Sequence, residues 1–241
     1  SLAVVFGVLT GVLVKKLGSE VNIITVLFYR FLFSLPILFL FAICVRGWHF
    51  LQINQRHIML FRVIFGCCGI TFWFLSLRHM PLGMATALFQ SSVIFITLLS
   101  PIFLGERVGL YRWSAVLTGL LGVLIIANPF SGDVSWHFLY GIGAALAGAV
   151  LSLLLRQLGK GDAPASVAIW YNLVGFAGLS AIVLSLPEQL YSINRAVIFD
   201  LILLGAIGAG LQIVLTTAYR YSDAVVVASM RYLQMPISGV V

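Results

Sequence analysis

Long apolar runs dominate the chain, and each is close to the length of a helix that crosses a lipid bilayer. About 20 apolar residues span the hydrocarbon core, because an α-helix rises about 1.5 Å per residue. The runs cover residues 1–17, 23–45, 58–80, 82–104, 110–127, 138–157, 165–186, 197–219 and 222–241. They are continuously apolar and do not alternate as the strands of a membrane barrel do. We therefore expect an all-α integral membrane protein with about nine visible transmembrane helices.

Charge is scarce throughout the sequence. Only 9% of the residues are charged and 61% are hydrophobic, whereas a soluble domain carries about 25% charged residues. The segments between the runs are short, and none has the length of a folded soluble domain. The function is therefore expected within the helical bundle or on its rim, with the lipid bilayer as its surroundings.

The net charge of +7 does not indicate a nucleic-acid partner, because the basic residues are scattered at the ends of the runs, where the positive-inside rule places them. With the amino-terminal side in the cytoplasm, eight basic residues lie in cytoplasmic connections: Arg46, Arg56, Arg62, Arg107, Arg112, Arg156, Lys160 and Arg220. Four lie in outer connections: Lys15, Lys16, Arg78 and Arg195. This imbalance predicts a multi-pass protein of the cell (inner) membrane in that orientation.

The residues that usually hold metals or carry out catalysis are dispersed. The three cysteines show no CxxC spacing, and the four histidines are far apart with no HExxH pattern. Zinc sites and disulfide frameworks need closer or patterned cysteines, and an intramembrane protease needs a serine–histidine pair or two membrane acids. We therefore expect no cofactor, no metal and no enzymatic activity.

Two halves of the chain are related by a single offset of 141 residues. Residues 12–18 (VLVKKLG) match residues 153–159 (LLLRQLG). Residues 76–87 match residues 217–228, and both stretches run from one helix across a tight turn into the next. One offset that serves two distant places indicates an internal repeat.

The offset predicts two repeats of five helices. The first covers residues 1–132 with helices one to five, and the second covers residues 138–241 with helices six to nine and helix ten missing. Residues 1–17 are expected to be a first helix whose beginning is missing, because the basic pair follows the apolar stretch, unlike in a signal peptide. Since five is odd, the second repeat enters the membrane with inverted orientation, as in many secondary transporters.

Short motifs along the whole chain now point to one family. They are 29–31 (YRF), 77–87 (LRHMPLGMATA), 104–107 (LGER), 112–113 (RW), 119–123 (GLLGV), 222–224 (SDA) and 231–236 (RYLQMP). With these motifs in this order the chain resembles the EamA family of the drug/metabolite transporter (DMT) superfamily. The resemblance implies a ten-helix bundle of two inverted five-helix repeats, with helices one, three, four, six, eight and nine around a central cavity.

One position departs from the pattern of that family. The family has a proline near the middle of helix four, whereas the position equivalent to Pro236 is here Phe95, and the proline of this helix is Pro101, nearer its end. We therefore expect helix four to bend at a different residue.

The most informative polar residue is Arg231, about nine residues into the last run and roughly 13 Å along a helix. Charged groups at such depth usually face a cavity or a partner. Gln90 is its repeat equivalent and Gln234 lies one turn beyond it on the same face. We predict that Arg231 binds an anionic group of the substrate, with Gln90 facing it across the midplane. The alternative is a structural arginine that caps carbonyl groups of a helix broken near Pro236.

Other side chains complete the predicted substrate site. Trp73, Thr86, Gln212 and Thr216 are candidates, because apolar walls with aromatic rings and a few polar groups suit small organic ligands. Arg30 is expected to have a structural role or to extend toward the outer face, since the resemblance implies that its helix lies outside the cavity wall.

The acidic residues all lie at or near the ends of the runs, and none is at mid-depth. Proton-coupled carriers commonly use membrane-embedded acids or histidines. Exchange or facilitated diffusion therefore fits this chain better than proton coupling through a buried carboxylate.

The predicted function is secondary transport of a small organic metabolite, amino-acid-like, nucleoside-like or drug-like, across the cytoplasmic membrane by alternating access. Uptake of S-adenosylmethionine is an alternative, because residues 231–234 (RYLQ) look like a stretch of the S-adenosylmethionine carriers of the same superfamily. A non-transporting membrane scaffold or receptor is the alternative from another class. The expected partners are a small-molecule substrate and the lipid bilayer, and not nucleic acid.

Overall fold

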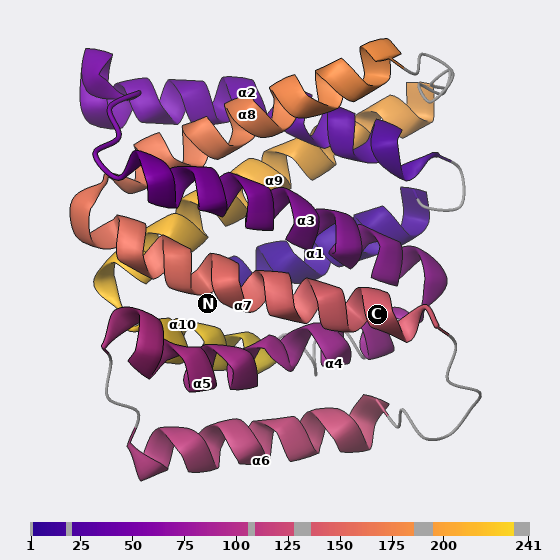
Figure 1. Ribbon diagram of the computed structural model, residues 1–241. Coiled ribbons are helices and arrows are strands. Elements are labelled where there is room, and N and C mark those ends of the chain that lie inside the picture. Colours follow the sequence, from indigo (N-terminus) through magenta and orange to yellow (C-terminus); the bar gives the residue numbers. More distant parts are fainter. Residues whose placement is uncertain (1, 18–20, 106–108, 128–135, 186–194, 234–241) are drawn as a thin grey trace.

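The computed structural model describes residues 2–17, 21–105, 109–127, 136–185 and 195–233, and every regular element in them is a helix. The α-helices are α1 (Leu2–Leu17), α2 (Ile23–Arg46), α3 (Arg56–His79), α4 (Leu82–Gln90), α5 (Ser92–Leu104), α6 (Leu110–Ala127), α7 (Phe138–Gly161), α8 (Pro164–Ser185), α9 (Arg195–Tyr221) and α10 (Ala224–Ser229). Two short 3-10 helices are η1 (Gly47–His49) and η3 (Met230–Leu233). The α-helices run side by side, and the chain turns at alternating ends of the bundle (Figure 1).

Six helical stretches in the described residues are long and apolar enough to cross a membrane. Large apolar side chains lie on the outside of the bundle, as Leu40 at 67% exposure and Ile102 at 78% show. In water such a surface would be unfavourable, whereas lipid tails solvate it. The prediction of an all-α membrane protein is therefore confirmed.

The predicted run over residues 82–104 is divided into α4 and α5 by a turn at Ser91. The Ser91 hydroxyl donates a hydrogen bond to the Leu88 carbonyl at 2.6 Å, and the Ser91 amide donates to the same carbonyl at 3.1 Å. A serine that bonds back to its own helix competes with the regular hydrogen-bond ladder and bends helices. The interruption thus occurs at a hydroxyl side chain, ten residues before Pro101.

The helix boundaries of the two halves correspond. Moved by 141 residues, α2 (23–46) falls on 164–187 and α3 (56–79) falls on 197–220, close to the observed α8 and α9. The contacts correspond as well, since α1 packs against α9, α3 packs against α7, and α2 packs against its own counterpart α8. Each half therefore contributes equivalent helices to the centre of the bundle.

Polar contacts hold the two ends of the bundle together. At one end the Asp162 carboxylate accepts hydrogen bonds from the backbone amides of Asn54 and Gln55, at 2.7 and 3.2 Å. At the other end Lys16 forms an ion pair with Asp200 at 2.7 Å. Both contacts join the first half of the chain to the second half.

Close packing between α2 and α9 depends on Gly205. A Cβ atom at this position would lie 2.5 Å from Phe33 Cβ and 3.0 Å from the Phe33 backbone carbonyl carbon. Small residues at such crossings allow membrane helices to approach closely. A methyl group here would therefore require a backbone shift.

We predict that Gly205→Ala lowers the stability of the protein by roughly 1–3 kcal/mol, the usual cost of overpacking. The measurement is thermal unfolding of the purified full-length protein in detergent. Gly178→Ala is the matched control, because Gly178 is exposed on α8 and has nothing within 4 Å of the added Cβ. Equal unfolding temperatures for both variants would contradict the assigned helix crossing.

Candidate functional site

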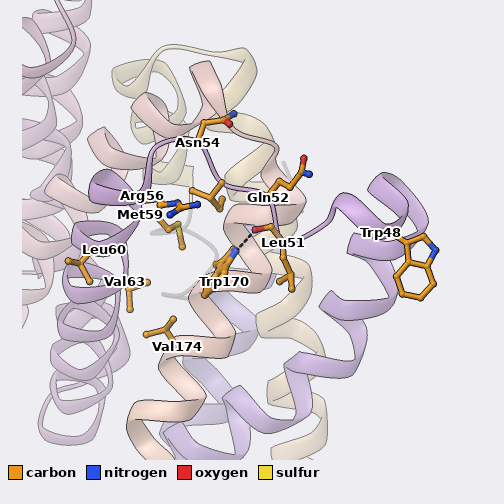
Figure 2. Close-up of a pocket in the computed structure, with 11 residues that line it drawn as sticks. Trp48, Leu51, Gln52, Asn54, Arg56, Met59, Leu60, Val63, Trp170 and Val174 are labelled. Atoms are coloured by element: carbon orange, nitrogen blue, oxygen red, sulfur yellow. Dashed lines mark hydrogen bonds between the residues drawn. The ribbon is translucent and has the colours of Figure 1, made fainter.

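Two cavities differ in position and chemistry. The larger, of about 930 Å³, lies beside the α2–α3 connection. Its lining residues are Trp48, Leu51, Gln52, Ile53, Asn54, Arg56, Met59, Leu60, Val63, Trp170 and Val174. Figure 2 shows Trp48 standing apart from the other side chains, while the Trp170 indole donates a hydrogen bond to the Leu51 carbonyl at 2.7 Å. This space lies at one end of the bundle, and among the described residues that line it Arg56 alone is charged.

The second cavity, which we call the central cavity, has a volume of about 140 Å³. It is lined by Ala3, Gly7, Thr10, Arg30, Gly66, Gly69, Ile70, Trp73, Phe74, Phe89, Gly148, Leu151, Ser152, Leu155, Tyr171, Leu211, Gln212, Leu215, Tyr219 and Arg231. Helices of both halves contribute to this lining, and two arginines are among its residues. The central cavity is therefore the better candidate site, although it is smaller than the 300–1,000 Å³ typical of ligand pockets.

One part of the central cavity is an aromatic wall that carries a cation. The Arg231 guanidinium lies over the Phe89 ring, 4.4 Å from its centroid, and the Phe89 ring is 4.7 Å from that of Trp73. A guanidinium over a ring face is held by cation–π attraction, and neighbouring rings favour tilted contacts of this kind. This wall can stack against a planar or apolar group and present a positive charge to it.

Gln90 links α4 to the equivalent segment of the second half. Its side chain is fully buried, and its Nε2 atom donates a hydrogen bond to the Arg231 backbone carbonyl. The Gln90 Oε1 atom has no hydrogen-bond partner among the described residues. Gln90 therefore supports the backbone that carries Arg231 and does not itself line the central cavity.

A second polar cluster, around Arg62, borders the central cavity through the lining residues Tyr171 and Gln212. Arg62 lies over the Tyr171 ring at 4.0 Å from its centroid, and its Nη2 atom donates a hydrogen bond to Gln212 Oε1 at 2.9 Å. The Tyr171 hydroxyl donates to the Gly66 carbonyl at 3.3 Å and is within hydrogen-bonding reach of Arg30. Two arginines thus converge on one tyrosine.

The positions predicted from the sequence for two arginine side chains are wrong. Arg62 was assigned to a connection, but it lies within α3 with 1% exposure. Arg30 was expected outside the cavity wall, yet it lines the central cavity with 2% exposure. Both long side chains turn inward, because the bundle offers Tyr171 and Gln212 as polar contacts where lipid offers none.

The remaining predicted site residues have varied surroundings. Trp73 and Gln212 line the central cavity. The Thr86 hydroxyl donates a hydrogen bond to the Leu82 carbonyl, and the Thr216 hydroxyl donates to the Gln212 carbonyl. Neither threonine lines the central cavity. Gln234 lies outside the described residues.

Sequence reasoning missed Phe89 and Arg62 as site residues. A signal for Arg62 exists on α3, where Arg62, Gly66, Gly69 and Trp73 recur at helical spacing. Residues at i, i+4, i+7 and i+11 share one helix face. Glycines on that face leave space next to the long arginine side chain, so the stripe marks one wall of the central cavity.

No group of three or more histidine, cysteine, aspartate or glutamate residues that could hold a metal occurs among the described residues. The described acids lie at helix ends, where Asp200 pairs with Lys16 and Asp223 with Arg156 at 3.1 Å. Chemistry in the central cavity therefore rests on guanidinium, amide, hydroxyl and aromatic groups.

The model of the EamA-like transporter family matches residues 1–128. The chain belongs to this family. The chain is similar to a "Riboflavin transporter" of Rhizobium johnstonii, at 32% identity over 87% of this chain and 67% of the relative. An "S-adenosylmethionine uptake transporter" of Rickettsia bellii is 27% identical over 95% of this chain and 77% of the relative.

The relatives and the fold agree on the general class. The chain spans 61% of the "Riboflavin transporter" of Vibrio cholerae, which is 31% identical over 80% of this chain. A protein of known crystal structure shares the fold with a TM-score of 0.73 at 16% identity, over 99% of this chain and 86% of its own. As an EamA-family protein, the chain is a multi-pass membrane transporter and not an enzyme, and in bacteria such a protein lies in the inner membrane.

We predict that Gly66→Ala displaces the Arg62 and Tyr171 side chains, because an added Cβ would clash with Arg62 Nη1 and would lie 2.7 Å from Tyr171 Cε2. The expected result is a loss of stability of about 1–3 kcal/mol, measured by thermal unfolding in detergent.

Gly69→Ala is the matched control on the same helix face. Its Cβ would meet Ala147 Cβ at 3.4 Å, an ordinary contact, and alanine favours helices over glycine. If Gly69→Ala were the more damaging change, the arrangement of side chains around Gly66 would be wrong.

Proposed function

We propose that this protein is a secondary transporter that moves a small organic metabolite across the cytoplasmic membrane by alternating access. The observation that carries the proposal is the central cavity, which both halves of the chain line and which holds Arg231 over an aromatic wall. An ionisable side chain among membrane helices, such as the half-buried Arg231, is by default a candidate for a substrate path. The small volume of the central cavity fits a closed conformation that must open to load its substrate.

The proposed mechanism uses two inverted repeats of five helices. The matched helix boundaries and the paired contacts of α1 with α9 and α3 with α7 support it. The interruption at Ser91 and the short helix η3 fall near equivalent places in the two halves. Broken helices at the repeat interface commonly form the binding sites of secondary transporters, around which the repeats rock.

In the proposed orientation the amino-terminal side of α1 is cytoplasmic. With Arg62 assigned to the bundle interior, seven basic residues remain in cytoplasmic connections against four in outer connections, which still favours this orientation. Because the described acids lie at helix ends, we propose exchange or facilitated diffusion and not proton coupling through a buried carboxylate.

The substrate is proposed to be amino-acid-like, nucleoside-like or drug-like. Relatives named as transporters of riboflavin and of S-adenosylmethionine, and an exporter of pseudopaline that is 29% identical over 73% of the chain, support an organic molecule of moderate size. Uptake of S-adenosylmethionine is the specific alternative. A scaffold or receptor role has less support, because it does not need a charged cavity between two repeats.

We predict saturable counterflow of at least one compound when the full-length protein is reconstituted in liposomes and screened with labelled amino acids, riboflavin, nucleosides and S-adenosylmethionine. Arg231→Gln should reduce flux at least tenfold, since losing a charge-assisted contact of about 1.4 kcal/mol has that effect. Lys160→Gln is the matched control, because Lys160 is exposed at the end of α7 and should leave the flux unchanged.

Two results would contradict the proposal. Flux equal to that of empty liposomes for every compound would exclude transport of these classes. Equal flux in Arg231→Gln and in the unaltered protein would exclude Arg231 from the substrate site and leave it a structural role.

A further inference from the structure

Arg30 and Arg62 approach each other from opposite ends of the bundle. Arg30 lies seven residues into α2 and Arg62 six residues into α3, and these consecutive helices start at opposite ends. The corresponding helix rises are roughly 10 Å and 9 Å, so both guanidinium groups extend toward the middle of the bundle. There Arg62 lies over the Tyr171 ring, 4.0 Å from its centroid, and Arg30 lies over the Phe31 ring, whose centroid is 5.4 Å from that of Tyr171.

The charges of this arginine pair are not neutralised by the described part of the protein. Arginine stays protonated in proteins, whereas a tyrosine hydroxyl and a cysteine thiol are uncharged at neutral pH. Of the described carboxylates, Asp162 binds the amides of Asn54 and Gln55, and Asp200 pairs with Lys16 at the end of the bundle. Two like charges therefore share a buried site, which is costly unless an anion joins them.

The arginine pair also has unused hydrogen-bond donors. The Nε and Nη1 atoms of Arg30 and of Arg62 are buried and have no hydrogen-bond partner among the described residues. A buried donor without a partner costs free energy, and two guanidinium forks match the oxygen atoms of a carboxylate or phosphate. The existing contacts of the pair, with Tyr171 and Gln212, orient these side chains and leave the donors free.

We propose that Arg30, which lines the central cavity, and Arg62, which lies against its lining residues Tyr171 and Gln212, form an anion subsite at the edge of this cavity that takes a carboxylate or phosphate group of the transported substrate. This inference rests on the proposed function and makes the substrate an organic anion. The apolar or planar part of this substrate faces Trp73 and Phe89. Trp73 lies on the same face of α3 as Arg62, with Gly66 and Gly69 between them. Arg62 and Trp73 are eleven residues apart on that helix, or about 16 Å, so the anionic and apolar groups of the substrate are separated.

The anion subsite can be tested with inorganic phosphate as the probe. Thermal unfolding of the purified full-length protein in detergent is followed against phosphate, with chloride at matched ionic strength. A ligand that binds the folded state raises the unfolding temperature saturably. We expect such a rise, with half-saturation about tenfold weaker in Arg30→Gln and in Arg62→Gln, and unchanged in Lys160→Gln, because Lys160 is exposed at the end of α7.

Stability without phosphate separates a binding role from a structural one. Because each arginine brings an uncompensated buried charge, Arg30→Gln and Arg62→Gln should unfold at the same temperature as the unaltered protein or higher. Arg30→Lys, which keeps the charge and loses the planar fork, should retain part of the phosphate effect. Lower stability of both Gln variants with an intact phosphate effect would show a structural role and overturn the proposal.

Other results would also overturn it. These are no saturable effect of phosphate on the unaltered protein, an equal loss of the effect in Lys160→Gln, and a loss confined to Arg231→Gln. Counterflow in liposomes tests the anion subsite and the transport function separately. Flux of an anionic substrate that is unaffected by Arg30→Gln and by Arg62→Gln overturns the anion subsite while the transport function stands. Absent flux with phosphate binding intact overturns transport while supporting the anion subsite.

Discussion

Burial of unneutralised arginine within a lipid-embedded bundle is the constraint on which the interior of this protein depends. A guanidinium cannot lose its proton and cannot move into lipid tails, so the surrounding helices must offer it aromatic faces, amide oxygens or an incoming anion. Arg62 has Tyr171 and Gln212, and Arg231 has Phe89. The helices that carry these contacts, α3, α4, α8, α9 and η3, all line the central cavity.

Close helix packing makes these contacts possible. Gly66 leaves space for the Arg62 side chain and the Tyr171 ring, and Gly148 leaves space for the Phe89 ring. In lipid the helices gain little from the hydrophobic effect, so packing and polar contacts decide how they associate. The same glycines that bring the backbones together therefore also position the charged side chains.

Much of the architecture could be predicted from the sequence. The apolar runs gave the helices within a few residues, because the length of a membrane helix is set by the thickness of the bilayer. The interruption at Ser91 was not located, since the run over residues 82–104 stays apolar on both sides of it. A hydroxyl that bonds to its own helix leaves no mark in hydropathy.

The candidate site was predicted only in part. Arg231, Trp73 and Gln212 line the central cavity as their depth and chemistry suggested. Arg30 was misplaced because the family resemblance implied that its helix lies outside the cavity wall. Arg62 was misplaced because it lies near the start of its run, where basic residues usually face water. Only the three-dimensional arrangement shows that an arginine side chain is long enough to reach the middle of the bundle from there.

The interruption between α4 and α5 lies at a serine and not at a proline. Proline removes a backbone donor permanently, so a helix broken by proline cannot become regular. Ser91 keeps its amide hydrogen, which now bonds to the Leu88 carbonyl. Because Ser91 also has right-handed helical dihedral angles (φ −59°, ψ −16°), the break between α4 and α5 leaves its backbone donor in place, unlike a break at proline.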